Sequence, residues 1–153
     1  MAEPIVLHGF DGLAAQVGET VGTSSWHTVR QEDIDTFAKL TGDEQWIHTD
    51  TARAADGPYG ATIQHGFLTL GLATGMLWEI CTVDGFGVVL NYGLNRVRFP
   101  AVLRVGSRIR MHVAVAEVKP LDGGAEAVYR LTYEIEGEPK PCCVADLVFR
   151  YYD

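Results

Sequence analysis

The sequence predicts an α+β fold in which an antiparallel β-sheet wraps around one long central helix. An apolar stretch from Gly66 to Ile80 has hydrophobic residues on every face, as expected of a helix surrounded by protein. The second half of the chain instead alternates apolar and polar residues, which is the period of half-buried strands. A sheet that packs on a buried helix accommodates both patterns. We expect one domain, residues 1–153, because this length suffices for a substantial core.

The first part of the chain contains shorter elements. A short amphipathic segment at 12–17 precedes an expected strand at 23–27. The residues Thr28 to Gln31 have the pattern of a capping box, which predicts that a helix begins there. Apolar residues at helical spacing continue until Gly42, where we expect that helix to end. The residues 49–60 are polar and rich in turn formers.

Four long antiparallel strands are expected after the central helix. The first runs from Val88 to Arg98, and the other three follow sets of alternating residues at 108–115, 128–135 and 143–151. Glycine-containing turns at 121–124 and 136–138 separate these last three strands.

The composition excludes several classes of function. The chain has 20 acidic and 12 basic residues, a formal charge of −8 that disfavours nucleic-acid binding. Three cysteines, two of them adjacent, form neither a disulfide framework nor a metal knuckle. The start of the chain lacks the pattern of a signal peptide, and the longest apolar stretch, Phe67 to Leu77, is too short to span a bilayer. We therefore expect a cytoplasmic protein that does not enter membranes.

The most informative residues are an acid, a base and a free amide. Asp43 and His48 lie five positions apart, just after the predicted helix end at Gly42. Gly66 opens the central helix, so its N–H has no acceptor within that helix. A carboxylate, an imidazole and an amide donor are the groups needed to add water across a polarised double bond.

At these residues the chain resembles the MaoC-like dehydratases, the (R)-specific enoyl-CoA hydratases with the hotdog fold. The resemblance extends over most of the chain and rests on these segments in this order: Leu40-Thr41-Gly42-Asp43, the Asp-x4-His pair, His65-Gly66, Arg98-Phe99-Pro100-Ala101-Val102 and Val105-Gly106. The chain departs from the family at Gln45-Trp46, where the usual motif has Asn-Pro. A branch that includes the nodulation-protein-N-like relatives looks similar to this version.

The resemblance implies reversible hydration of a trans-2-enoyl thioester to an (R)-3-hydroxyacyl thioester. Asp43 would accept a proton from the water that attacks C3, and His48 would hold this water and help to deliver a proton to C2. The Gly66 N–H would bind the thioester oxygen as negative charge develops on it. No metal and no cofactor are expected.

Further residues are expected to act around this centre. We assign Gln45, Thr74 and Trp46 to orienting water or substrate, with Trp46 either shaping the acyl channel or packing beneath the loop. Arg96 and Arg98 belong to the densest basic cluster of an acidic protein. They either face solvent on a strand or bind the phosphates of coenzyme A, which arginine forks recognise. The carrier of the thioester is coenzyme A or an acyl carrier protein.

A homodimer is the expected assembly. A single curved sheet leaves an exposed edge, and such edges are commonly covered by pairing. The resemblance implies two subunits with a continuous sheet and an active site near their interface.

Two other functions remain open on the residues alone. An acyl-CoA thioesterase is the first, since one fold hosts both activities. Thioesterases typically take their carboxylate from the central helix, however, and here the stretch from Gly66 to Leu77 has no acid and Glu79 comes late. A non-catalytic acyl-binding subunit is the second. The sequence contains neither a dinucleotide-binding loop nor a Gly-x-Ser-x-Gly nucleophile.

A metal site is a weaker alternative. Asp43, His48, His65 and Asp50 are residue types that bind zinc or iron. They lack the i, i+4 pairing on one helix that makes such motifs persuasive. We expect His65 instead to have a structural role, with its ring bonding a loop carbonyl or capping the helix.

Overall fold

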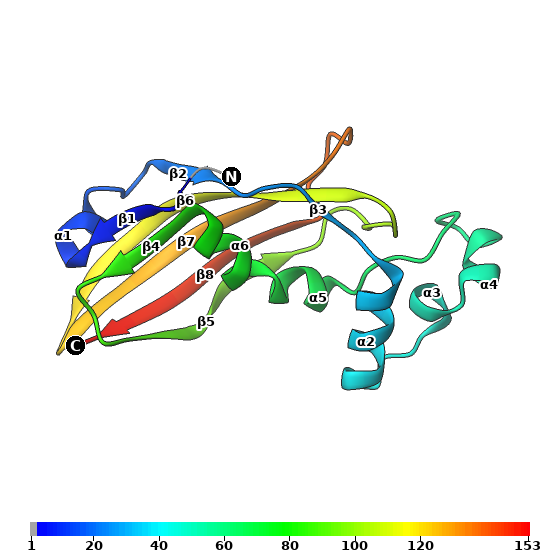
Figure 1. Ribbon diagram of the computed structural model, residues 1–153, viewed down its shortest axis with the longest axis horizontal. Coiled ribbons are helices and arrows are strands. Elements are labelled where there is room, and N and C mark those ends of the chain that lie inside the picture. The colour runs from blue at the N-terminus through cyan, green and yellow to red at the C-terminus, as the bar shows by residue number, and fades with distance from the viewer. Residues whose placement is uncertain (1–2) are drawn as a thin grey trace.

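A computed structural model describes residues 3–153 and contains a six-stranded antiparallel sheet with the strand order β2-β6-β7-β8-β5 and with β3 also paired to β6 (Figure 1). Its strands are β2 (Thr20–Thr23), β3 (His27–Thr28), β5 (Val88–Arg98), β6 (Arg108–Leu121), β7 (Gly124–Ile135) and β8 (Cys143–Tyr152). A separate parallel pair joins β1 (Ile5–His8) to β4 (Cys81–Asp84). The first of the four long strands therefore forms one edge of the sheet, beside the last.

The four long strands are present as the alternation predicts. The strand expected from Val88 to Arg98 has these bounds in the structure, and a two-residue turn joins β6 to β7 between Leu121 and Gly124. The strand expected at 23–27 is wrong in detail, because β2 and β3 are separated there. Ser24 interrupts the ladder by using its hydroxyl, in place of a backbone carbonyl, to accept the Met111 N–H at 2.9 Å.

Short helices precede the central helix. They are α1 (Gly9–Ala14), α2 (Gln31–Thr41), α3 (Trp46–Thr49) and α4 (Thr51–Ala55). Helix α2 ends at Gly42, whose φ of 77° lies in the left-handed region that favours glycine. The predicted capping box is wrong: Arg30 is the N-cap of α2, and no side chain caps this helix. The Gln31 amide turns away instead and donates to the His48 carbonyl at 2.7 Å.

The central helix consists of two segments, α5 (Gly66–Gly71) and α6 (Ala73–Ile80), which follow one another along the sheet (Figure 1). The chain therefore follows the predicted helical path from 66 to 80, but the prediction of one regular helix is wrong because the helix is interrupted at Leu72. Helical bonds continue across this junction, because the Leu72 N–H donates to the Leu68 carbonyl and its own carbonyl accepts from Met76. The preceding Gly71 weakens a helix at this point, since glycine costs about 1 kcal/mol relative to alanine.

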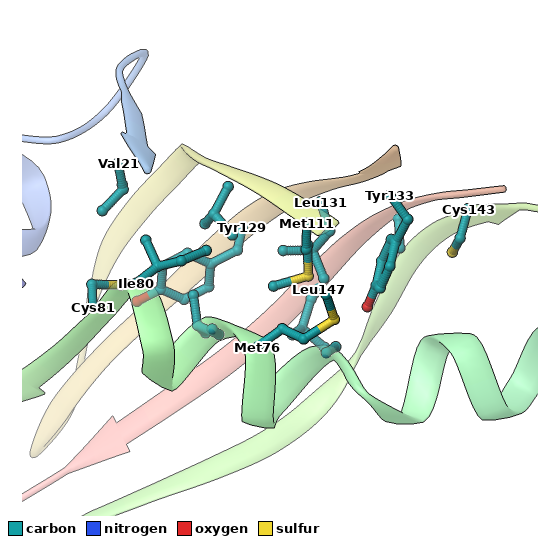
Figure 2. Close-up of a cluster of buried hydrophobic side chains, with 14 of the residues drawn as sticks. Val21, Met76, Ile80, Cys81, Met111, Tyr129, Leu131, Tyr133, Cys143 and Leu147 are labelled. Carbon is teal, nitrogen blue, oxygen red and sulfur yellow. The ribbon is translucent and has the colours of Figure 1, made fainter. Parts of the chain in front are cut away.

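The core lies between α6 and the inner face of the sheet. Figure 2 shows Met76 and Ile80 of the helix directed toward side chains of the strands, namely Met111, Tyr129, Leu131 and Leu147. Within a single chain, the sheet covers only part of the central helix. Phe67 is 74% exposed and Trp78 is 54% exposed, so one side of the helix is left uncovered.

Helices α2, α3 and α4 lie beyond the end of the sheet where α5 begins (Figure 1). The loop that follows α2 is thereby placed next to the first turn of the central helix. Within residues 3–153, none of the helices is long and apolar enough to cross a bilayer.

Candidate active site

Asp43 is held at the start of the loop that follows α2. Its side chain is 54% exposed, and its backbone carbonyl accepts a hydrogen bond from the ring of His65, whose Nε2 lies at 2.9 Å. The left-handed turn at Gly42 directs the chain from α2 back toward the first residues of α5. The carboxylate is therefore accessible, while the backbone that carries it is fixed.

His48 is the base that the structure prepares most clearly. Its side chain lies on α3 and is buried, with 7% of the residue exposed. The Nδ1–H donates to the Ile63 carbonyl at 2.6 Å, because a carbonyl oxygen only accepts, and Nε2 then carries the free lone pair. Burial lowers the pKa of His48, and the neighbouring His65 lowers it further. The neutral imidazole is the form that accepts a proton.

His65 supports both residues. Its ring stacks on that of His48, with centroids 3.7 Å apart and planes inclined by 21°, and it contacts Phe37 on another side. Because its Nε2–H donates to the Asp43 carbonyl, the expected bond to a loop carbonyl is present. Its Nδ1 is buried without a hydrogen-bond partner among residues 3–153.

The structure brings the predicted acid and base together. One side-chain atom each from Asp43, His48 and His65 lie within 4.8 Å of one another. An oxygen of Asp43 lies 3.9 Å from Nε2 of His65. This spacing places an exposed carboxylate beside a buried imidazole, which are the two groups that general acid–base chemistry needs.

Gly66, the predicted amide donor, lies beside His48. It lines a pocket of about 190 Å³ together with His48, Thr69 and Phe99. As the first residue of α5, it has an N–H with no acceptor inside the helix. A Cβ at this position would approach the Phe99 ring to 3.1 Å, so the absence of a side chain permits this close packing.

Four polar side chains near the site were not predicted. Gln31 donates to the His48 carbonyl and accepts from the hydroxyl of the buried Thr62, so it joins the two segments that hold the His48 ring. Gln64 is buried and donates to the Thr69 hydroxyl at 2.8 Å. Thr69 could have been found from its spacing, because it lies one helical turn beyond Gly66. The bonds of Gln31 to His48 and Thr62 span 17 and 31 residues, so no local pattern indicates them.

The residues expected to orient water or substrate have different positions. Gln45 is exposed, and its backbone carbonyl rather than its side chain accepts the His48 N–H. Trp46 does not line the pocket. The Arg53 guanidinium lies 4.3 Å from the centroid of its ring, and Gly57 packs against the same ring. These contacts agree with the second of the two expected roles, packing beneath the loop. Thr74 lies on α6, two turns beyond Gly66, and does not line the pocket. Thr69, one turn beyond Gly66, does line this pocket.

Arg96 and Arg98 extend from the outer face of β5. They line a groove of about 470 Å³ with Pro100, and Arg130 and Asp146 form an ion pair at 2.9 Å on its other side. Arg98 donates only to the carbonyl of the preceding residue, and neither arginine forms an ion pair among residues 3–153. Their charges are free to meet an anion.

The metal alternative fits the geometry less well. Asp50 is used as the N-cap of α4, where it accepts from the Arg53 N–H. His48 and His65 are stacked almost parallel, so the lone pairs in the two ring planes run side by side rather than converging on one ion. This arrangement favours acid–base chemistry over ligation.

The acid of the central helix is engaged elsewhere. Glu79 accepts from the Ser25 backbone and hydroxyl and pairs with His27 at 2.6 Å. It lies thirteen residues beyond Gly66, which corresponds to roughly 20 Å along a helix. A thioesterase of the expected kind would need a carboxylate from this helix in the pocket. Glu79 does not supply one, because it is paired with Ser25 and His27.

Comparison with known proteins identifies the family. A family profile described as a MaoC like domain matches residues 13–137. The 3-hydroxyacyl-thioester dehydratase Z of Mycobacterium tuberculosis is 49% identical over 140 residues, covering 91% of this chain and 93% of that protein. Nodulation protein N of Rhizobium leguminosarum bv. viciae is 40% identical over 140 residues, covering 89% and 86%. The expected similarity to this branch is thereby confirmed.

Solved structures agree on the fold. A protein described as the monoamine oxidase regulatory protein from Archaeoglobus fulgius superposes with a TM-score of 0.80 at 25% identity, covering 99% of both chains. The (R)-hydratase from A. caviae involved in PHA biosynthesis superposes with a TM-score of 0.71 at 21% identity, covering 87% of this chain and 94% of that one. The family match over residues 13–137 and these relatives confirm the resemblance found in the sequence: the chain belongs to the MaoC-like dehydratases and is a hydro-lyase with the hotdog fold.

Proposed function

We propose that this dehydratase is an (R)-specific enoyl-thioester hydratase, which interconverts a trans-2-enoyl thioester and an (R)-3-hydroxyacyl thioester. The single observation that carries this proposal is the meeting of an accessible carboxylate, Asp43, with a neutral imidazole, His48, beside the first amide of the central helix. The name of the mycobacterial relative, a 3-hydroxyacyl-thioester dehydratase, supports the substrate class.

In the hydration direction, one water molecule supplies all the atoms that are added. Nε2 of His48 accepts a hydrogen bond from this water and holds it, and Asp43 takes its proton as the oxygen bonds to C3. The electrons of the double bond move to the thioester oxygen, which the Gly66 N–H stabilises. The proton is then delivered to C2 with the help of His48. An amide donor in such a role is worth roughly 10²–10³ in kcat.

Arg96 and Arg98 would bind the carrier of the thioester. Two guanidinium groups without acidic partners in a protein of net charge −8 suit the phosphates of coenzyme A or of a phosphopantetheine arm. Substituting both by glutamine should raise KM and weaken its salt dependence, while kcat changes little.

A homodimer would cover the apolar edge of the sheet. Val88, Leu90, Tyr92 and Leu94 on β5 are each 42–58% exposed, and the exposed Trp78 adds to the uncovered apolar surface. An exposed apolar edge strand is usually covered, for example by pairing with the same strand of a second subunit. Size-exclusion chromatography with light scattering should give twice the chain mass at micromolar concentration; a monomer would contradict this assembly.

The activity assay separates hydration from thioester hydrolysis. The protein is mixed with crotonyl-CoA, and the loss of conjugated-enoyl absorbance is followed together with the release of free thiol. We expect loss of absorbance without thiol release. Thiol release without hydration would replace this proposal by a thioesterase, and binding without turnover would indicate an acyl-binding subunit.

Two variants test the assigned roles. Asp43→Asn and His48→Gln should each lower kcat by at least the ~10²–10⁴-fold of general acid–base catalysis. Asp56→Asn, a substitution of an exposed acid that does not line the pocket, is the matched control. Near wild-type turnover in Asp43→Asn or His48→Gln, with circular dichroism unchanged, would show that the roles are wrongly assigned.

A further inference from the structure

Gln64 is a buried polar residue of the candidate active site to which the proposed chemistry assigns no role. It is 7% exposed, and it lines the pocket of about 190 Å³ that also contains His48 and Gly66. Its backbone N–H donates to the Leu103 carbonyl at 2.7 Å, and the preceding residue, Ile63, accepts the Nδ1–H of His48. The side chain therefore extends from a segment whose position is fixed relative to His48.

The amide nitrogen of Gln64 is held at the first turn of α5. Its Nε2 donates to the Thr69 hydroxyl at 2.8 Å. This hydroxyl donates its own hydrogen to the His65 carbonyl at 3.4 Å, so its oxygen accepts, and the nitrogen of the amide faces Thr69. Side chains of a helix tilt toward its N-terminus, so the Thr69 hydroxyl lies over the turn that begins at Gly66. The bond thus brings Nε2 close to that turn.

One hydrogen of the Gln64 amide has no acceptor in the described part of the chain. A primary amide carries two N–H donors, and among residues 3–153 this side chain forms one hydrogen bond, the one to Thr69. Buried donors are nearly always paired, so an unpaired one suggests a partner that arrives with a ligand. Because Thr69 also lines the pocket, the free N–H lies at the pocket wall.

The reacting end of an enoyl thioester offers one good acceptor, its carbonyl oxygen, since the sulfur accepts only weakly. Gln64 and Gly66 are two positions apart in the sequence, so their Cα atoms are at most about 7 Å apart. An oxygen that is bonded to the Gly66 N–H is therefore within reach of the amide that Thr69 holds on the same wall.

We propose that Gln64 is a second oxyanion donor, whose free Nε2–H binds the thioester oxygen together with the Gly66 N–H. The inference rests on the proposed function, which places this oxygen at Gly66. As the electrons of the double bond move to the oxygen, both donors stabilise the developing charge. When the proton reaches C2, the carbonyl forms again and the two bonds weaken. Gln64 gives up no proton, so its contribution is electrostatic.

The infrared carbonyl band of bound crotonyl-CoA measures this bond directly. The ligand is labelled with ¹³C at the thioester carbon and bound to Asp43→Asn, in which we expect little turnover. Hydrogen bonds to the carbonyl oxygen move its band to lower wavenumber, so the band should lie below that of the free ligand. Adding Gln64→Met, which has a similar shape and no N–H, should return part of this shift. Gln16→Met is the matched control, since Gln16 does not line the pocket, and it should leave the band in place.

Kinetics separate an electrostatic role from a structural one. In the otherwise wild-type enzyme, Gln64→Met should lower kcat for crotonyl-CoA about 10²-fold, with a much smaller effect on KM, because the charge develops after binding. Gln64→Glu keeps the shape of the side chain, but its carboxylate has no N–H and repels the enolate. Its kcat should fall at least as far.

Thr69→Val keeps the test decisive if substitution of Gln64 prevents folding. This variant leaves Gln64 in place but removes the acceptor that orients its amide, so the carbonyl band should move part of the way toward that of the free ligand. Circular dichroism and Tm verify that each variant is folded.

Two results would overturn the proposal. The first is a carbonyl band that stays at the Asp43→Asn position when Gln64→Met is added, or when Thr69→Val is added if the former does not fold. The second is a folded Gln64→Glu enzyme with near wild-type kcat. If crotonyl-CoA does not bind to Asp43→Asn, this inference and the proposed function fail together. A band that moves with Gln64→Met, while the wild-type protein does not hydrate crotonyl-CoA, would contradict the proposed function and support the hydrogen bond from Gln64.

Discussion

Replacement of Gln31 by leucine should reduce both stability and turnover, because this side chain joins the two segments that hold His48. Its amide donates to the His48 carbonyl at 2.7 Å, and its oxygen accepts from the Thr62 hydroxyl. Ile63, which follows Thr62, accepts the Nδ1–H of His48. The amide nitrogen of Gln31 also donates to the Asp35 carboxylate at 2.8 Å. Leucine has a similar size and supports none of these bonds.

The expected magnitude follows from the two bonds to His48 and Thr62. An unsatisfied buried partner costs about 1–3 kcal/mol, and both bonds are partly buried, so we expect a loss of about 3 kcal/mol in the free energy of unfolding. For a chain of this length, that lowers Tm by roughly 6–12 °C. If the His48 ring moves by on the order of 1 Å, kcat falls by up to ~10²-fold. KM should change little, since Gln31 does not line the groove that contains the arginines assigned to the carrier.

Two further variants make this test specific. Gln31→Glu keeps an acceptor for Thr62, but it has no donor for the His48 carbonyl and adds a carboxylate beside Asp35, so both Tm and kcat should stay low. Glu32→Leu, an exposed neighbour on α2, is the control for adding a leucine. Differential scanning calorimetry and steady-state hydration of crotonyl-CoA measure both effects. A Gln31→Leu enzyme that loses stability but keeps the wild-type kcat would refute the positioning role.

Four other outcomes are expected. Because burial lowers the pKa of His48, the neutral form should persist below about pH 6.5, and the acid limb of kcat should lie under that value. The folded state then binds this proton less readily than the unfolded chain, so the stability contributed by His48 is complete above about pH 6.5 and is lost as the pH falls below it. Thr69→Val should lower kcat/KM about tenfold, whereas Thr74→Val should leave it within twofold, both measured with crotonyl-CoA. Gly66→Ala should lower kcat at least tenfold by pressing on Phe99, and Phe99→Leu in the same chain should recover part of it. Dialysis against a chelator should leave activity unchanged; a loss restored by zinc or iron would revive the metal alternative.

The alternation and glycine signals predicted the sheet well because they are local. The strand from Val88 to Arg98 has its predicted bounds, and Gly42 ends α2 because few other residues adopt its positive φ. The break at Leu72 was not predicted, since Gly71 alone is compatible with an uninterrupted helix. Phe67 and Trp78 were expected to be buried because hydrophobicity does not distinguish a core from a surface that awaits a partner.

The site was predictable only as far as spacing determines it. Asp43 lies in the loop just before α3 and His48 lies on α3, so their separation of five residues was enough to place them together. Gln31 was assigned to a helix cap because capping boxes are recognised locally, whereas its partners near the site, His48 and Thr62, lie 17 and 31 residues away. Trp46 illustrates the same limit. An aromatic residue in a catalytic loop suggests a substrate contact, and only the fold reveals that Arg53 covers its ring.

The most direct test is a crystal structure of the Asp43→Asn variant with crotonyl-CoA bound. The account predicts that the thioester oxygen lies 2.7–3.1 Å from the Gly66 nitrogen, the distance expected of an oxyanion donor. It also predicts one water between residue 43 and Nε2 of His48, placed on one face of C3. A thioester bound away from Gly66, or a His48 ring turned away from C3, would contradict the account.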